Sequence, residues 1–182
     1  LLATAKKNIS YQQNRLKIFE IGKQFIHKKE SVKETEVVAG LVTGLALPEH
    51  WDVKMRDVDF FDVKADIEAL LIMSGRASDV EFLAEKHPAL APGQTARIYI
   101  TKKSIGWVGV LHPQLQRSFG IKKNIILFSL QTKNIFQKGY QAFQSYGKFP
   151  WVRRDLAVVV DENVAASELV SEAQKVGGKL LQ

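Results

Sequence analysis

The sequence of 182 residues contains no cysteine. This absence excludes disulfide frameworks, thiolate metal sites and cysteine nucleophiles, and it fits a protein of the reducing cytoplasm. No apolar run approaches the roughly 20 residues that a membrane-spanning helix needs, so we expect no membrane partner. Internal repeats and low-complexity segments are also lacking, and the fractions of hydrophobic (46%) and charged (25%) residues are ordinary. The composition therefore predicts a cytoplasmic globular protein.

Acidic residues are missing from residues 86–154, although the chain contains 19 of them. The same 69 residues include twelve basic side chains, so the net charge of +7 is localised. We call these twelve residues the basic block: Lys86, Arg97, Lys102, Lys103, Arg117, Lys122, Lys123, Lys133, Lys138, Lys148, Arg153 and Arg154. Such a block suggests an anionic partner, although a merely solvated basic face has the same composition.

Candidate catalytic and metal-binding residues are few. The chain has four histidines, His27, His50, His87 and His112, which are spread too widely for a local metal motif. His87 and His112 each precede a proline, which is typical of turn residues. The acids between Asp57 and Asp66 are better explained as helix caps and a solvated helix face than as acid–base catalysts. No phosphate-binding loop and no Ser/His/Asp arrangement with its usual context is present. We therefore predict neither a catalytic residue nor a metal ligand in this chain.

Residues 57–75 form the segment around which the rest of the chain is organised. Their apolar residues recur at steps of three and four and so make one stripe on a helix: Phe60, Val63, Ile67, Leu70 and Leu71. Asp59 can cap the start of this helix together with Asp62, and Gly75 supplies a stop. We expect an amphipathic helix packed across a sheet, with Phe60, Ile67 and Leu71 buried.

The remaining pattern predicts an α+β fold. We expect two short strands or one bent strand over residues 16–26, a polar loop over 28–34, and strands over 37–47, 80–83, 96–101, 104–111, 124–130 and 156–160. Pro48 should end the strand over residues 37–47, and Pro92 and Gly93 should form a turn. Lys102 and Lys103 should connect the strands over 96–101 and 104–111 in a hairpin. Short helices are expected over residues 1–9 and 114–119, and a longer one over 166–176 before Gly177. Sequential antiparallel strands with inserted helices indicate the α+β class.

Five stretches, in the same order, resemble segments of the β chain of bacterial phenylalanine–tRNA ligase. They are LLATAKKN with RLKIFEIGKQF, then DFFDVKADIEALL, HPALAPGQTARI, GWVGVLHPQL and KFPWVRRDLAVVVD. Together they cover nearly the whole chain. Because the sequence also starts without an initiator methionine, we expect it to be a C-terminal part of a longer β chain.

The resemblance implies a fold and a function. Residues 1–146 would form part of a catalytic-like module, a class II synthetase-like antiparallel sheet with flanking helices that has lost the ATP and amino-acid site. Residues 147–182 would supply the first strand and helix of a ferredoxin-like anticodon-binding domain. In that family an α₂β₂ tetramer attaches phenylalanine to tRNA(Phe) using ATP and magnesium, and the active site lies on the α chain. We therefore expect this segment to be inactive alone, to bind no cofactor, and to serve assembly and tRNA binding.

Two groups of basic-block residues are candidate contacts. Arg153 and Arg154 beside Trp151, together with Lys148, are predicted to bind tRNA, because arginine can fork onto phosphate and tryptophan can stack on bases. Strand alternation should direct one of the two arginines inward. Lys102 and Lys103 are predicted to contact the α chain.

Two other functions fit parts of the sequence. An autonomous basic nucleic-acid-binding domain is supported by the basic block alone, and RNA binding without an α chain would favour it. An independent hydrolase or transferase would require polar residues that converge in a pocket.

Overall fold

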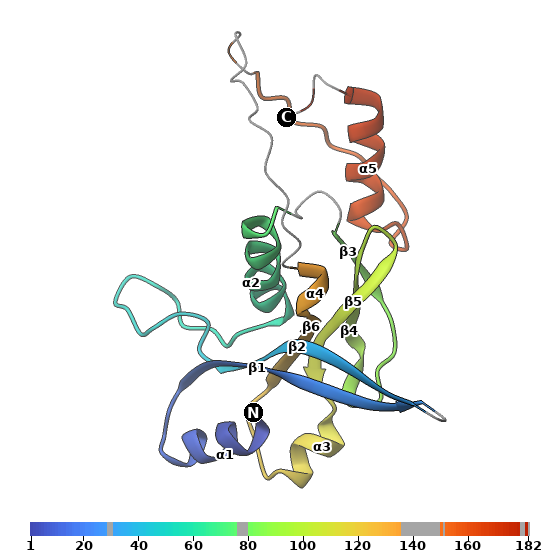
Figure 1. The fold of residues 1–182 in the computed structure, drawn as a ribbon. Coiled ribbons are helices and arrows are strands. Elements are labelled where there is room, and N and C mark those ends of the chain that lie inside the picture. Colours follow the sequence, from blue (N-terminus) through green and yellow to red (C-terminus); the bar gives the residue numbers. More distant parts are fainter. Residues whose placement is uncertain (29–30, 76–79, 136–149, 151, 179–180, 182) are drawn as a thin grey trace. The chain divides into compact units, whose positions relative to one another are not determined.

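The computed structural model describes residues 1–28, 31–75, 80–135, 150, 152–178 and 181 (Figure 1). The chain divides into two units, Leu1–Ala142 and Phe143–Gln182. The first unit contains α1 (Leu2–Ser10), β1 (Arg15–Lys28), β2 (Ser31–Gly44), α2 (Phe60–Met73), β3 (Val80–Ala84), β4 (Leu90–Ile100), β5 (Lys103–Leu111), α3 (Pro113–Ser118), β6 (Ile125–Gln131) and α4 (Thr132–Ile135). The second unit contains α5 (Ala166–Gly177).

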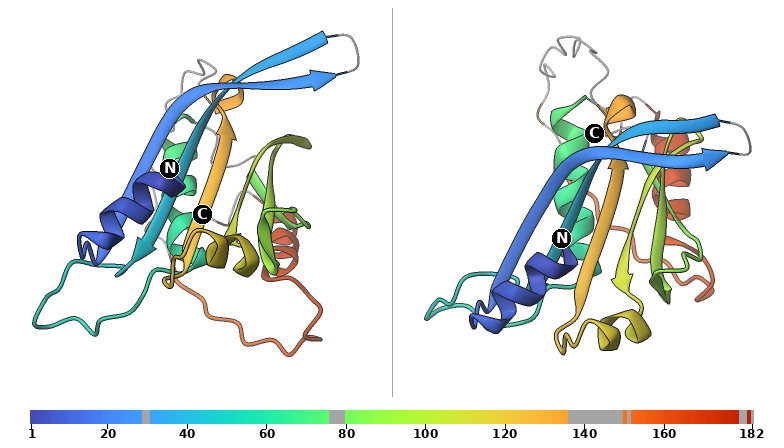
Figure 2. Two further views of the ribbon diagram at one scale, coloured as in Figure 1. Left: turned by 90° about the horizontal axis from the view of Figure 1, so that it is seen from below. Right: turned by 60° about the horizontal axis from the view of Figure 1, so that its bottom comes forward.

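The first unit is built on one antiparallel sheet of six strands in the order β1-β2-β6-β5-β4-β3. Neighbouring residues of a strand point to opposite faces, so Ile125 and Ile126 of β6 belong to two separate clusters. The cluster that contains Ile126 packs under α2, and the cluster that contains Ile125 includes Ala5 of α1 (Figure 2). The predicted α+β class is confirmed. In the part of the chain that the structure describes, no helix is long and apolar enough to cross a membrane.

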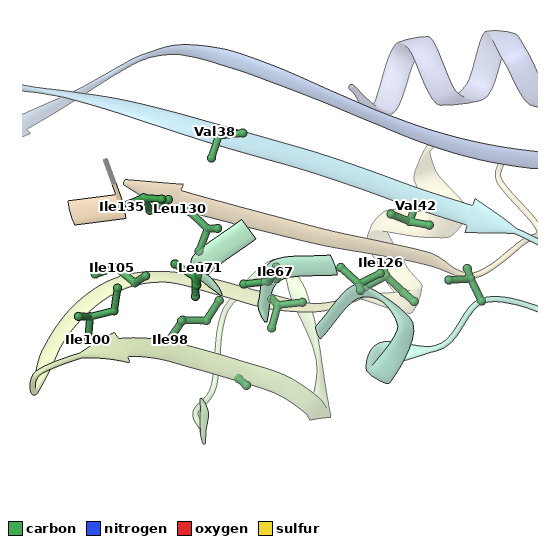
Figure 3. Packing of buried hydrophobic residues seen from close by; sticks show 14 residues of the cluster. Val38, Val42, Ile67, Leu71, Ile98, Ile100, Ile105, Ile126, Leu130 and Ile135 are labelled. Atoms are coloured by element: carbon green, nitrogen blue, oxygen red, sulfur yellow. The ribbon is translucent and has the colours of Figure 1, made fainter. Parts of the chain in front are cut away.

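Helix α2 forms as the sequence predicts. The side chain of Asp59 accepts hydrogen bonds from the backbone amides of Phe61 and Asp62, and the Asp62 carboxylate accepts one from the Asp59 amide, which completes a capping box. Val63, Ile67 and Leu71 are buried, in agreement with the predicted stripe. Figure 3 shows Ile67 and Leu71 among apolar side chains of the strands. Phe60, which was also expected to be buried, is only partly covered.

Arg56 and Asp62 stabilise the start of α2. The two guanidinium NH groups of Arg56 donate to the two carboxylate oxygens of Asp62 at 2.6 Å each. These hydrogen bonds, opposed in part by burial, hold the pKa of Asp62 at about 2. The carboxylate is therefore ionised throughout the neutral range and joins Arg56, four positions before the helix, to the first turn of α2.

We expect the first unit to lose stability with falling pH through this contact. Because the pKa of Asp62 is lower in the folded chain than in the unfolded chain, the stabilisation is complete above pH ~4 and is lost as the pH falls towards about 2. Asp62→Asn should lower the free energy of unfolding at pH 7 and flatten its dependence on pH in this window, as measured by urea titration at a series of pH values. Asp66→Asn, which removes the exposed Lys17–Asp66 pair, is the control. Equal pH profiles for wild type and Asp62→Asn would contradict this account.

The hairpin of β1 and β2 is longer than the sequence suggested. The expected polar loop over residues 28–34 is wrong, because β1 continues to Lys28, β2 begins at Ser31, and each strand has 14 residues. Polar residues can continue the ladder here since cross-strand pairs, such as the Lys23–Glu34 salt bridge at 2.5 Å, stabilise a hairpin that is open to solvent. At the other end β2 stops at Gly44 rather than at Pro48. Gly44 has φ 86°, and a Cβ at this position would lie 1.9 Å from the Asn14 carbonyl oxygen.

Two predicted turns also differ. Thr101 and Lys102 are the central residues of the β4–β5 turn, with φ values of 48° and 63°, while Lys103 already pairs with Ile100. Positive φ at both central positions matches the right-handed twist of the flanking strands. Pro92 and Gly93 lie inside β4, where the register with β5 shifts, so they form an irregularity in the strand rather than a turn before it.

The second unit contains one of its two predicted elements. Helix α5 is present, but residues 156–160 do not form a strand. A strand needs a hydrogen-bonded neighbour, and none of the described residues pairs with this segment, in which Leu156 is 89% exposed. The prediction of a strand over residues 156–160 is therefore wrong.

Candidate nucleic-acid interface

In the described part of the first unit, six basic-block residues form two groups rather than one surface, and Lys86 and Arg97 belong to neither group. Arg117 of α3, Lys122 and Lys123 precede β6, whereas Lys133 of α4 follows it. Lys103 begins the antiparallel neighbour β5 and so lies at the same end of the sheet as Lys133 (Figure 2). A strand of seven residues spans about 20 Å, which keeps the two groups apart.

Lys103 and Lys133 line a hollow at this end of the sheet, which we call the lysine groove. Its volume is about 480 Å³. Its lining comes from β2, β5, β6 and α4: Lys33, Glu34, Thr35, Glu36, Lys103, Gln131, Thr132 and Lys133. The groove thus brings together side chains that are up to 100 positions apart in the sequence.

The acids of the lysine groove are already engaged. Glu34 pairs with Lys23 at 2.5 Å, and its hydrogen bond raises the pKa of the Lys23 ammonium group. Glu36 accepts a hydrogen bond from the Thr132 hydroxyl at 2.5 Å. By contrast, three lysines of the groove have no ion-pair partner among the described residues: Lys33, Lys103 and Lys133. The groove can therefore attract an anionic group, such as a carboxylate or a phosphate.

Of the two predicted α-chain contacts, Lys103 lines the groove and Lys102 is exposed in the adjoining turn. Lys33 was not predicted as a contact residue, because residues 28–34 were expected to form a loop. The β-branched residues Val32, Thr35 and Val37 were the available signal for the strand that places Lys33 there.

The predicted tRNA contacts belong to the second unit or lie outside the described residues. Lys148 and Trp151 are in the latter group. Arg153 and Arg154 are both exposed, so the expectation that one of them points inward is wrong; it assumed a strand that does not form. The Nε of Arg153 donates to Asp155 at 3.3 Å, whereas Arg154 forms no ion pair with a described side chain and is exposed.

The histidines act as turn residues where the structure describes their contacts. The Nδ1 atoms of His50, His87 and His112 accept backbone amide hydrogen bonds from residues two positions later. The ring of His87 also lies 4.6 Å from that of Trp107, and burial lowers the pKa of His87. No group of three or more His, Cys, Asp or Glu side chains in the described ranges could hold a metal ion.

A second hollow, of about 580 Å³, lies beside the start of α2. Its walls include Phe60, Phe61 and Phe82, while its charged groups have other roles: Asp59 caps the helix and Lys64 pairs with Glu68 at 2.6 Å. The described residues of this hollow supply no nucleophile with an adjacent base, so they give no support to a hydrolase or transferase.

One known protein family matches most of this sequence. Its sequence model, described as the phenylalanyl tRNA synthetase beta chain CLM domain, matches residues 1–132, which is more than two thirds of the chain. The chain belongs to this family. The resemblance found in the sequence is thereby confirmed.

Curated relatives of this CLM domain are named phenylalanine–tRNA ligase beta subunit. The relative from Methylococcus capsulatus (strain ATCC 33009 / NCIMB 11132 / Bath) is 42% identical over 182 residues, which are 100% of this chain and 23% of the relative. Relatives from Dickeya dadantii (strain 3937) and Yersinia pestis are 39% and 38% identical over 184 and 180 residues, or 100% and 97% of this chain and 23% of each relative. The chain thus spans about a quarter of the length of these relatives.

The family match includes most of the features described above. The six strands, α2, Lys33 and Lys103 lie within residues 1–132 and belong to the CLM domain, while Lys133 directly follows the matched range. Arg153, Arg154 and α5 lie beyond it. The two predicted groups of contact residues therefore belong to different parts of the chain.

Proposed function

We propose that this chain is part of the β subunit of a phenylalanine–tRNA ligase, and that this segment serves subunit assembly and tRNA binding without carrying the reaction. The family match over residues 1–132 supports this proposal most directly. The whole enzyme attaches phenylalanine to tRNA(Phe) in the cytoplasm as an α₂β₂ tetramer. ATP and magnesium serve the active site on the α chain, and this chain holds neither.

The same proposal extends to the two units. The antiparallel sheet of the CLM domain corresponds to a class II synthetase-like module, and residues 147–182 correspond to the start of a ferredoxin-like anticodon-binding domain. Lys102 and Lys103 contact an acidic patch of the α chain, and the free ammonium groups of the lysine groove support this role. Arg153 and Arg154, together with Lys148 and Trp151, contact tRNA; the exposure of both arginines supports their part.

We expect the isolated chain to show no phenylalanine-dependent ATP–pyrophosphate exchange, because its sequence contains no arginine or acid constellation typical of that active site and its described residues form no metal cluster. Exchange should appear when an α chain is combined with the full-length β chain. The measurement is the rate of pyrophosphate incorporation into ATP with phenylalanine present and absent. Exchange by the isolated chain, or a full-length β chain that fails to co-purify with the α chain, would contradict the proposal.

One observation favours a second function. Because the three lysines of the groove have no partner among the described residues, the chain could bind RNA by itself. Fluorescence anisotropy with labelled tRNA and no α chain tests this alternative. Binding at physiological salt that matches the affinity of the full complex would favour an autonomous RNA-binding domain.

A further inference from the structure

A loop between β2 and α2 stands away from the sheet (Figures 1 and 2). Two backbone hydrogen bonds join its ends. The Ala46 amide donates to the Arg56 carbonyl at 3.0 Å, and the Val58 amide donates to the Gly44 carbonyl at 2.8 Å. We call residues 46–56 the Trp51 loop. Because its base is fixed by backbone hydrogen bonds, the loop presents its side chains from a defined position on the CLM domain.

The Trp51 loop exposes large apolar side chains. Trp51 is 90% exposed, and its ring stacks on that of His50, with ring centroids 5.6 Å apart. Leu47, Val53 and Met55 are also exposed, and all three line one shallow hollow of about 50 Å³. Single exposed apolar residues are common, but four of them within nine positions mark an interaction surface. Tryptophan and methionine are enriched at protein interfaces, and tryptophan is frequent among their hot spots.

The charges around Trp51 select the kind of partner. Glu49 and Asp52 lie two positions before and one position after Trp51 in the sequence, and neither forms an ion pair with any residue that the structure describes. Arg56, at the base of the loop, is already bound to Asp62, which leaves Lys54 as the uncommitted cation. An acidic tip repels the phosphates of a nucleic acid. The Trp51 loop therefore fits a protein that offers an apolar pocket with a basic rim.

We propose that Trp51 inserts into an apolar pocket of the α chain, and that Lys or Arg side chains at the rim of that pocket face Glu49 and Asp52. This inference rests on the proposed function and adds to it a defined contact surface. The Trp51 loop follows the end of β2, whereas Lys33 lies near its start. Fourteen strand residues span about 46 Å, so this contact is separate from the one assigned to Lys102 and Lys103.

The test uses the full-length β chain and the purified α chain, with the dissociation constant measured by isothermal titration calorimetry. Trp51→Ala should raise this constant at least tenfold, as expected for a central tryptophan anchor. The double variant Glu49→Lys/Asp52→Lys keeps the ring and should also weaken binding, most strongly at low salt. Phe25→Ala, which removes an aromatic ring that is 61% exposed on β1, is the matched control and should leave the constant unchanged. Unchanged melting temperatures of the free variants will show that folding is intact.

The outcomes separate the inference from the proposed function. If the wild-type β chain does not bind the α chain, the proposed function fails. If wild type and Trp51→Ala bind the α chain equally well, the inference alone is overturned. It is also overturned if Trp51→Ala weakens tRNA binding without affecting the α chain. Self-association of the wild-type β chain that Trp51→Ala abolishes would assign the loop to a second copy and would likewise reject the α chain as its partner.

Discussion

Ile67→Ala is expected to lower the free energy of unfolding of the CLM domain by about 2 to 5 kcal/mol, the usual range for truncation of a large core side chain. Ile67 is 1% exposed and lies on the buried stripe of α2 between Val63 and Leu71. The strands beneath contribute Ile98, Ile126 and other members of the same cluster (Figure 3). Loss of three carbons here removes apolar contacts and leaves a cavity that the surrounding strands can only partly fill.

Urea unfolding and thermal melting of the 182-residue chain, without a partner, measure this loss. A change of 1 kcal/mol corresponds to a shift of about 2 to 4 °C for a domain of this size. Phe61→Ala on the same helix is the control, because the Phe61 ring is 72% exposed and its removal should have little effect. An unchanged melting curve for Ile67→Ala would contradict the placement of α2 across the sheet.

The sequence predicted the elements that depend on local signals. The start of α2 was identified because Asp59 and Asp62 cap it through their own side chains, and its buried face was identified because the apolar period is 3.6 residues. Strands β3, β5 and β6 were found within a few residues of their bounds for a similar reason, since they are short apolar runs. Family membership was also readable from the sequence, through the order of its motifs.

The sequence could not show features that arise from pairing between distant segments. Residues 28 and 31–34 look like a loop because most of them are polar, but the pairing of β1 with β2 holds them in a ladder. Residues 156–160 look like a strand because they are β-branched and apolar, yet no described neighbour pairs with them. The lysine groove depends on the register that places Val37 opposite Gln131, which no local pattern specifies. For the same reason the basic block, continuous in the sequence, is divided in space.

Reversal of Lys102 and Lys103 to Glu is expected to abolish binding of the full-length β chain to the α chain. Under the proposed function these residues face acidic groups, so the reversal replaces attraction with repulsion at the same distance. The affinity for tRNA should stay nearly intact, because the arginines assigned to tRNA lie in the second unit. Analytical ultracentrifugation measures assembly, and fluorescence anisotropy measures tRNA binding.

The lysine groove also provides a direct test of the opposite assignment. If the groove binds tRNA, the triple variant Lys33→Gln, Lys103→Gln, Lys133→Gln should reduce the slope of log Kobs against log salt by about 2 to 3, because each lost phosphate contact contributes about 0.7 to 0.9. Lys122→Glu/Lys123→Glu makes the same change of charge as the Lys102/Lys103 reversal at the other end of β6, so it controls for net charge. The groove would be assigned to tRNA by two results together. The complex with the α chain still forms after reversal of Lys102 and Lys103, and the triple variant reduces the slope of log Kobs against log salt. If no variant changes the binding of the α chain or of tRNA, the groove is a solvated basic surface. Mobile counterions then neutralise its ammonium groups as well as any ligand does.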